Sequence, residues 1–428
     1  MVALDPTPAQ ERLLLSHAGA ARFAYNAGLA HVRAAIEAKE KPEWSLYGLR
    51  RWWNANKDTL AMNADGTPWW RENSKEAYSS GLESLANALS NWSKSRKGER
   101  KGRRVGFPTF KAKDRQRPRF AYTTVSFGLI EGDLKALRLP RIGRVHCMEN
   151  VTGRVRGAKV VRMTVSRRAG RWYASLTVER DAPTVKQAPK AGAVGIDLGV
   201  KNLATLSDGT VIDNPRCLAA SERRLKRAHK ALSRKTRGSK RRLKARNKVA
   251  RIHARIASRR RDLLDKLTTW LAGTYSDISI EDLNVAGMVR NHRLAKAVND
   301  ASFAELRRQL EYKTARTGAR LHVVDRWYPS SKMCSRCGRV KAKLSLTERT
   351  YRCEHCGVTM DRDLNAAINI KVAGSAPETL NAHRGTARRN DLSGRATLDP
   401  VKCEPSRGDN RVRLGADGRK TVLQATTN

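Results

Sequence analysis

The chain has 428 residues, is 40% hydrophobic, and carries 86 Lys and Arg against 40 Asp and Glu, which gives a formal net charge of +46. This length and apolar content can bury the cores of two or three domains, which excludes a disordered basic tail. The charge predicts a polyanionic partner such as nucleic acid. A basic ribosomal or chromatin-like protein would share the charge, but it would not need dispersed acidic motifs. There is no signal-peptide-like start and no apolar stretch that could span a bilayer, so we expect a soluble protein.

The amino-terminal region begins with a helix signal, in which Thr7, Pro8 and Gln10 supply an N-cap, a first-turn proline and a capping-box glutamine. A second helix is expected after Asn73, because apolar residues then recur at three- and four-residue steps. This stripe predicts a packed core and comprises Tyr78, Leu82, Leu85, Leu89 and Trp92. Three polar residues off the stripe could contact DNA or simply be solvated, namely Lys75, Ser79 and Ser80.

The segment 92–122 is basic and irregular, and its prolines and glycines prevent a continuous helix. Aromatic residues, including Phe107 and Phe110, are interleaved with the charges. Aromatic rings can stack on unpaired bases while Arg and Lys bind phosphates, a combination that suits RNA or opened DNA. The same aromatics could instead anchor the strands of a small barrel, and strand patterns do follow at 159–166 and 172–179.

A stretch rich in proline and small residues, 182–192, predicts a linker between domains. After it, an apolar strand at 193–199 carries Asp197, and 203–212 has the pattern of a hairpin. This opening resembles that of an RNase H-like sheet, in which a strand aspartate holds metal. On its own, however, such an aspartate could equally be a surface acid of a strand.

The next block, 216–271, is dominated by Lys and Arg. Apolar residues recur at helical steps in both of its halves, and Gly238 marks the break between them. We therefore expect a helical hairpin with one buried stripe and a basic exterior that lines a nucleic-acid channel and binds backbone rather than sequence. The candidate contacts on this hairpin are Arg241, Arg242, Arg251 and Arg255.

After the hairpin, a short strand at 277–280 ends in Glu281, a helical pattern covers 301–317, and a further strand covers 321–325. This alternation of strands and helix predicts an α/β core rather than a helical bundle.

Three acids that are far apart in the chain, Asp197, Glu281 and Asp363, stand at the points where such a core could bring them together. Carboxylates held at strand ends can bind two Mg²⁺ ions, which clamp the attacking and leaving oxygens of a phosphodiester. The three acids therefore predict a nuclease.

Four of the seven cysteines form two C-x2-C pairs, which are Cys334 with Cys337 and Cys353 with Cys356. Their spacing can close a tetrahedral site, and the glycine after each pair permits the tight backbone that such a site needs. In a reducing compartment these pairs favour zinc over disulfides. Since a four-cysteine site has no open coordination position, we expect a structural zinc ribbon beside the third acid.

A set of motifs occurs in a fixed order along residues 1 to 373: NAGLAHV, FPTFKAK, GIDLGVKNLATLSDG, SIEDLNV, SKMCSRCG, YRCEHCG and DRDLNAAINI. Together they resemble the transposon-encoded TnpB family, whose relatives include compact type V CRISPR effectors and the eukaryotic Fanzor proteins. The resemblance implies an RNA-guided DNA endonuclease with a RuvC-like nuclease domain. It also implies a cytoplasmic, prokaryotic protein that is associated with the nucleoid when it is on DNA.

By this resemblance, Asp197, Glu281 and Asp363 match the three RuvC acids and hold two Mg²⁺ or Mn²⁺ ions. The family's D-x-N spacing favours Asp363 over Asp361 as the third acid. A guide RNA from the transposon end would pair with double-stranded target DNA after the amino-terminal region recognises a short adjacent motif. Tyr78 and its polar neighbours lie on the helix that resembles the motif-reading one.

The resulting expectation is an α+β multidomain monomer, in which a helical region and a small β-barrel-like wedge domain precede an RNase H-like (RuvC) α/β nuclease core with a helical insertion and a four-cysteine zinc ribbon. The alternative is an RNA-guided DNA-binding protein, a domesticated or CRISPR-associated relative with weak or no cleavage. The expected segments are the start of the wedge (1–35), a helical recognition domain (36–105), the wedge domain (106–181), the linker (182–192), the nuclease core (193–325), the zinc-ribbon lobe (326–360), the last RuvC segment (361–373) and a flexible tail (374–428).

Overall fold

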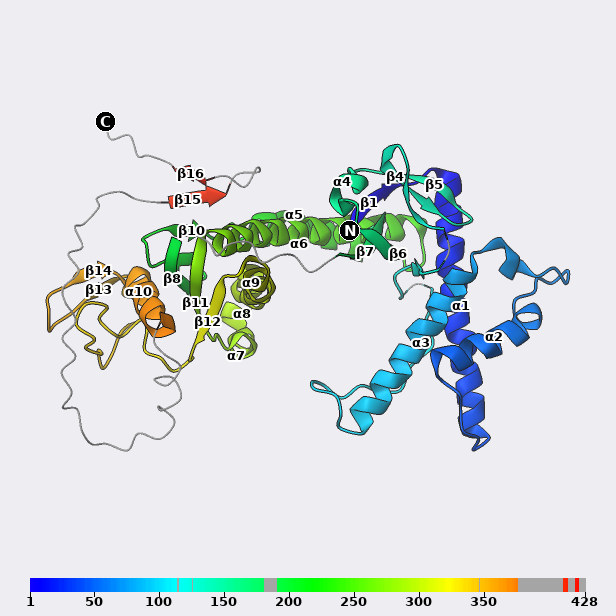
Figure 1. Cartoon of the computed structure of the whole chain (residues 1–428), viewed down its shortest axis with the longest axis horizontal. Coiled ribbons are helices and arrows are strands. Elements are labelled where there is room, and N and C mark those ends of the chain that lie inside the picture. Colours follow the sequence, from blue (N-terminus) through cyan, green and yellow to red (C-terminus); the bar gives the residue numbers. More distant parts are fainter. Residues whose placement is uncertain are drawn as a thin grey trace. The chain divides into compact units, whose positions relative to one another are not determined.

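The computed structural model describes residues 1–113, 115–124, 126–180, 191–345 and 347–375, and the backbone of two short strands at 411–414 and 420–422. The chain divides into two compact units, Met1–Ala182 and Pro183–Asn428 (Figure 1). Among the described helices, none has the length and apolar character needed to cross a membrane. The expected linker lies outside the described residues up to residue 190.

The helices of the first unit are α1 (Pro8–Glu37), α2 (Leu46–Leu60), the short η1 (Trp69–Glu72) and α3 (Lys75–Arg96). The predicted capping box of α1 is confirmed, because Thr7 and Gln10 exchange both of its hydrogen bonds. The predicted second helix is also confirmed as α3, with Ser74 as its N-cap. Helices α1 and α3 approach closely, since a Cβ placed on Gly81 would lie 2.1 Å from the carbonyl oxygen of Ala21.

The first unit also holds a seven-stranded sheet with the strand order β2-β6-β7-β1-β5-β4-β3. Its strands are β1 (Val2–Asp5), β2 (Arg119–Tyr122), β3 (Gly128–Ile130), β4 (Asp133–Leu139), β5 (Gly143–Cys147), β6 (Lys159–Arg168) and β7 (Arg171–Glu179), and the short helix α4 (Val151–Val155) precedes β6. The two strands predicted at 159–166 and 172–179 are confirmed as β6 and β7, which pair antiparallel. The order is that of an open sheet with β2 and β3 at its edges.

The second unit is built on another seven-stranded sheet, with the order β12-β11-β8-β9-β10-β15-β16. Its strands are β8 (Ala191–Leu198), β9 (Asn202–Leu206), β10 (Val211–Asp213), β11 (Tyr275–Glu281), β12 (Arg320–Val324), β15 (Arg411–Leu414) and β16 (Lys420–Val422). Strand β9 is antiparallel to β8 and β10, whereas β11 lies parallel to both β8 and β12. The predicted alternation of strands and helix after the basic block is confirmed by β11, the helix α9 (Phe303–Thr317) and β12.

Two expected boundaries are wrong. The first strand begins at Ala191 and not at residue 193, because Ala191 pairs with Tyr275 in the parallel ladder between β8 and β11. Part of the expected flexible tail is also ordered into strands, since β15 pairs with β10 and β16 pairs with β15. The edge of β10 offers unpaired backbone groups that such a strand can satisfy.

The helices of the second unit are η2 (Ala219–Ser221), α5 (Glu222–Ser233), α6 (Lys240–Thr274), α7 (Val285–Arg290), α8 (His292–Ala301), α9 (Phe303–Thr317) and α10 (Arg362–Ser375). The predicted helical hairpin is present as α5 and α6, and Gly238 between them has a positive φ of 85°. Its buried stripe is made by Ala228, Val249, Ile252 and Ile256. Helix α6 continues to Thr274, past the expected end at residue 271.

Helix α10 lies directly against the sheet of the second unit. A Cβ on Gly195 in β8 would be 2.1 Å from the carbonyl oxygen of Ala367, and one on Gly374 would be 2.0 Å from the Ser279 hydroxyl in β11. Glycine at both positions therefore lets the helix and the strands approach without an intervening side chain. This contact sets the distance between the first turn of α10 and the strands β8 and β11.

Candidate functional site

The three candidate acids come together at one edge of the second sheet. Strands β8 and β11 are parallel neighbours with Ile196 opposite Ile280, so Asp197 and Glu281 follow at the same carboxyl end. Asp363 lies in the first turn of α10, which packs on β8. The chain thus folds three acids from distant segments into a single electrostatic neighbourhood.

The negative charge around the three acids affects the pKa of Asp197. Burial, and after it the carboxylates of Glu281 and Asp363, raise the pKa of Asp197 to about 8, while the guanidinium of Arg362 opposes them. Carboxylates that are withdrawn from water and crowd one another disfavour their own ionised forms unless a cation compensates them. Carboxylate oxygens are the donor type that a hard divalent cation such as Mg²⁺ prefers, so the chemistry of these side chains suits the predicted metal, although among the described residues only the four cysteines are gathered closely enough to form a metal site as they stand.

Glu281 is oriented by a neighbour that sequence reasoning missed. Burial raises the pKa of Glu281, and a hydrogen bond donated by the Ser330 hydroxyl to Oε1 works against this rise. Ser330 is itself buried, and its carbonyl oxygen accepts a bond of 2.8 Å from Asn369 of α10. The helix that carries Asp363 therefore also fixes the residue that holds Glu281.

Two aspartates compete for the third position, and the structure gives them different surroundings. Oδ1 of Asp361 accepts hydrogen bonds from the backbone N–H groups of Asp363 and Leu364, at 2.8 and 3.1 Å. Asp361 is thus the cap of α10, a role that satisfies free helix N–H groups. Asp363 forms an ion pair of 3.0 Å with Arg362. These contacts favour Asp363 as the third acid.

The four cysteines form a compact sulfur cluster beside α10. Their Sγ atoms all lie within 4.8 Å of one another, with 3.6 Å separating Cys334 from Cys356 and Cys337 from Cys353. Zinc–sulfur bonds of about 2.3 Å in a tetrahedron require sulfur atoms about 3.8 Å apart, so the cluster fits Zn²⁺. Among the described residues, this is the one group arranged to hold a metal by such a geometric test.

Two asparagines of α10 attach the cysteine lobe to the helix. Asn365 accepts a bond of 2.9 Å from the backbone N–H of Ser335, and its side chain donates to the carbonyl oxygen of Met333 at 2.7 Å. Asn369, one turn later, donates to the same Met333 oxygen and to that of Ser330. Both asparagines are buried. Their spacing of four residues, which places two amides on one face of the helix among apolar residues, is the sequence signal that could have indicated this contact.

The residues of α3 that were expected to read DNA differ in accessibility. Tyr78 is 1% exposed, stacks on Trp53 and donates its hydroxyl to the carbonyl oxygen of Trp70, so its expected role in contacting DNA is wrong. Its side chain belongs to the core stripe that the periodicity predicted. Ser79 and Ser80 are half-buried, and Lys75 is exposed at the start of the helix.

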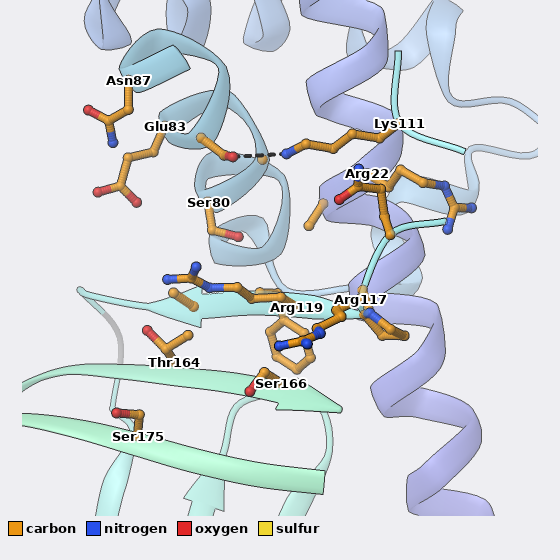
Figure 2. Close-up of a pocket in the computed structure, with 18 of the residues that line it drawn as sticks. Arg22, Ser80, Glu83, Asn87, Lys111, Arg117, Arg119, Thr164, Ser166 and Ser175 are labelled. Carbon is orange, nitrogen blue, oxygen red and sulfur yellow. Dashed lines mark hydrogen bonds between the residues drawn. The ribbon is translucent and has the colours of Figure 1, made fainter. Parts of the chain in front are cut away.

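A cavity of about 1290 Å³ opens beside Ser80 in the first unit. Its wall combines polar side chains with several cations, which come from α1, α3, β2, β6, β7 and the segment before β2 (Figure 2). The labelled residues in this view are Arg22, Ser80, Glu83, Asn87, Lys111, Arg117, Arg119, Thr164, Ser166 and Ser175. Among the described residues of this wall, Glu83 is the one acid, and Arg162 holds it by two hydrogen bonds of 2.5 and 2.7 Å.

Lys111 is held at the rim of this cavity by several contacts. The side chain of Asn26 bonds both to its backbone N–H and to its carbonyl oxygen, at 2.8 and 3.1 Å. Its Nζ donates to the Ser84 hydroxyl at 2.9 Å and stands 3.5 Å from the centre of the Tyr25 ring. Burial and, after it, the charge of Arg119 lower the pKa of Lys111 to about 8. These contacts hold the Lys111 side chain in one position at the rim of the cavity.

Of the two aromatic residues in the basic segment, one is a packing anchor and the other is exposed. Phe107 packs edge-on against Trp92 with ring centres 4.9 Å apart, as an anchor would. Phe110 is 49% exposed and carries the guanidinium of Arg33 over its face at 4.8 Å. Phe110 is the one whose ring could still reach a base.

On the basic hairpin, Arg241, Arg251 and Arg255 are exposed. Arg242 is half-buried, and it donates to the carbonyl oxygens of Leu232 and Lys235 at the turn between α5 and α6. Arg242 therefore closes the hairpin, while its neighbours present their charges outward.

Comparison with known proteins gives three matches to family models. The model described as "Probable transposase" matches residues 174–292, "Cas12f1-like, TNB domain" matches 303–370, and "Helix-turn-helix domain" matches 2–41. In this structure, residues 2–41 form β1 and the single long helix α1.

Relatives match along most of the chain. A protein of Mycobacterium tuberculosis (strain CDC 1551 / Oshkosh), provisionally named an RNA-guided DNA endonuclease, is 40% identical over 410 residues, which are 90% of this chain and 88% of the relative. InsQ of Escherichia coli (strain K12), with the same provisional description, is 33% identical over 87% of this chain and 91% of its own length. A solved Cas12f1–sgRNA–target DNA complex shares the fold, with a TM-score of 0.50 at 15% identity over 85% of this chain and 83% of that one. The chain has a Cas12f-like mixed α and β fold, and by its relatives it belongs to the transposon-encoded TnpB family.

Proposed function

We propose that this protein is an RNA-guided DNA endonuclease of a transposon, which binds a guide RNA from the transposon end and cleaves complementary double-stranded DNA beside a short adjacent motif. The names of its relatives and its family support this assignment. The single observation that carries the cleavage step is the convergence of Asp197, Glu281 and Asp363 at the carboxyl ends of β8 and β11, where burial and the two neighbouring carboxylates raise the pKa of Asp197 to about 8. Such a site is poised to take up cations.

In this proposal Asp197, Glu281 and Asp363 hold two Mg²⁺ or Mn²⁺ ions. When bound, the ions supply the positive charge that activates water and stabilises the leaving 3′ oxygen of the phosphodiester. The chain's own residues prepare the site: Ser330 orients Glu281, and Arg362 offsets part of the negative charge of the metal-free form. The carboxylates that would bind the metal ions are thereby positioned before the DNA binds.

The four cysteines hold a structural Zn²⁺ in the same proposal. The zinc would stabilise the lobe that Asn365 and Asn369 attach to α10. Since the segment from Tyr328 to Met333 includes Ser330, the lobe and the acids are mechanically connected through this helix. Zinc would thus contribute to cleavage indirectly, through the positions of Glu281 and of the helix that carries Asp363.

The cavity beside Ser80 is our candidate surface for the adjacent DNA motif. Its mixture of hydroxyl, amide and guanidinium groups can bind both phosphates and base edges. We assign backbone contacts to the exposed arginines of the α5–α6 hairpin, and contact with an unpaired base to Phe110. We also propose a recognition domain at 36–105, a wedge domain at 106–181 and a nuclease core that begins at Ala191.

The test begins with protein purified together with co-expressed transposon-end RNA. Sequencing the bound RNA identifies the guide, and a library of DNA targets matched to it identifies the adjacent motif. We expect cleavage that requires Mg²⁺ or Mn²⁺ and that disappears in Asp197→Asn, while target binding persists. Recovery of no guide-sized RNA would refute guided activity. Binding without metal-dependent products from the unchanged protein would leave a guided DNA-binding protein.

A further inference from the structure

One tryptophan of this chain differs from the others in its surroundings. Of the nine tryptophans, Trp327 is 85% exposed, whereas the other eight are buried or half-buried. Their partners include the hydrophobic cores and other aromatic rings. None of the described residues makes a ring or cation–π contact with Trp327. Trp327 is thus an exposed aromatic face that is available to a ligand, and its place in the fold decides which ligand it suits.

The backbone at Trp327 is fixed to the end of β11, the strand that carries Glu281. Trp327 lies in the turn 325–330, where its N–H donates to Asp325 Oδ1 at 2.8 Å. Just before Trp327 in the chain, Arg326 pairs with Asp282, and three residues after it Ser330 donates to Glu281. The turn is therefore attached at both ends to two successive residues of the acidic edge. Trp327 is held beside the candidate active site while its ring remains free.

A cavity adjoins this turn at Arg326, and Trp327 itself does not line it. A cavity of about 310 Å³ is lined by Glu281 and Arg326 together with apolar side chains such as Leu283 and Val285. An unpaired nucleotide combines a flat apolar base with an anionic phosphate, and both properties find partners here. A protein ligand would need a wider apolar patch than a single ring.

We propose that Trp327 is a stacking platform for an unpaired base of the DNA strand that is cut at the acidic edge. The inference rests on the proposed nuclease function and adds to it a positioning residue outside the acids. Because every base has a π-face, the platform tolerates any sequence and acts on where the strand lies. The ligand class is single-stranded DNA, with the base on the indole and the adjoining phosphate beside the acids.

The test uses the purified protein–RNA complex in an Asp197→Asn background, which prevents cleavage. The probe is a single-stranded DNA oligonucleotide that carries one 2-aminopurine, whose fluorescence falls when the base stacks on an aromatic ring. We expect quenching with Trp327 present, retention of most quenching in W327F, and its loss in W327L, which keeps an apolar side chain without a ring. W327L should also bind the oligonucleotide roughly 5- to 100-fold more weakly.

W327S serves as a second ring-free variant, and both should unfold at the unchanged temperature because the ring is exposed. Equal quenching in W327L, W327S and the unchanged chain would overturn the proposal, as would the absence of quenching in all of them. In the cleaving protein, W327L should raise the KM for a guide-matched target more than W327F does. If the unchanged protein cleaves the guide-matched target and W327F, W327L and W327S cleave it equally well, the inference about Trp327 fails while the proposed nuclease function stands. If the unchanged protein does not cleave with metal, the proposed function fails, and the oligonucleotide arm still decides the role of Trp327.

Discussion

Two carboxylates withdrawn from solvent, one in each unit, show how the same chemical group can be given opposite surroundings. Glu76 at the start of α3 is 5% exposed and accepts hydrogen bonds from the N–H and hydroxyl of Thr123 and from the hydroxyl of Thr124. Burial alone would raise the pKa of Glu76, but these bonds outweigh burial and lower it. Asp197 is half-buried beside two other carboxylates, and its pKa is raised instead.

The difference separates a group that holds the fold from a group that waits for a ligand. Glu76 has all the partners it needs within the chain, so it stabilises the junction of α3 and β2. Asp197 is crowded by like charges, and its ionised form costs free energy until a cation is bound. An acid withdrawn from solvent is therefore informative about function only when its partners are counted.

The largest expected effect is on cleavage by Asp197→Asn. Cleavage of a guide-matched target should fall by a factor on the order of 10⁴, because one of the three acids loses its charge. The melting temperature of the metal-free protein should be unchanged or higher, since a crowded carboxylate has been replaced by a neutral amide. A lower melting temperature would show that Asp197 is a structural acid like Glu76.

Replacing a zinc ligand should have the next largest effect. Cys334→Ser should reduce the bound zinc, as measured by atomic absorption, and destabilise the lobe by more than about 4 kcal/mol. Cys217→Ser is the matched control, because Cys217 lies outside the cluster. Full zinc content in Cys334→Ser would remove this cysteine from the site.

Glu76→Gln should lower the free energy of unfolding by about 2 to 3 kcal/mol, because an amide replaces a charged acceptor of three hydrogen bonds. Denaturant unfolding of the metal-free protein measures this change, with the exposed Glu72→Gln as a control. Glu76→Gln should therefore destabilise the metal-free protein, whereas Asp197→Asn should leave its stability unchanged or raise it. Destabilisation by both substitutions would contradict the difference between the two acids.

The smallest effect concerns a buried histidine. His17 accepts a bond of 3.1 Å from the N–H of Ser74 and contacts the Leu13 carbonyl oxygen at 2.9 Å, and burial lowers its pKa. Its contribution to stability is thus complete above the unfolded pKa of about 6.5 and is lost as the pH falls below it, by at most about 1.4 kcal/mol per pH unit. Unfolding measured from pH 7 to 5 should show a shallower pH dependence in His17→Gln. An unchanged slope would mean that His17 is protonated in the fold.

The sequence allowed prediction of features with local causes. The capping box at Thr7, the stripe of α3 and the two cysteine pairs depend on short spacings, and the structure confirms each of them. The misassigned features depend on tertiary packing. Tyr78 has the polar hydroxyl of a contact residue, yet Trp53 and Trp70 enclose it.

Contacts between distant segments were equally out of reach of spacing arguments. Nothing near Glu281 in the sequence indicates Ser330 as its partner, because the two meet only when β11, the turn 325–330 and α10 have assembled. The choice of Asp363 over Asp361 as the third acid stays a prediction. The motif places both at the start of a helix, and the structure adds that Asp361 caps this helix.

The contact between Gly195 and α10 has a consequence for how relatives are classified. Alanine at this position would bring a Cβ to 2.1 Å from the Ala367 carbonyl oxygen, and the helix carrying Asp363 would have to move away from Asp197. A single nucleotide change in the glycine codon could therefore silence a nuclease in which every acid is intact. To classify a relative as an active nuclease, one should therefore check for the three acids and also for glycine at the position of Gly195, two residues before the first acid.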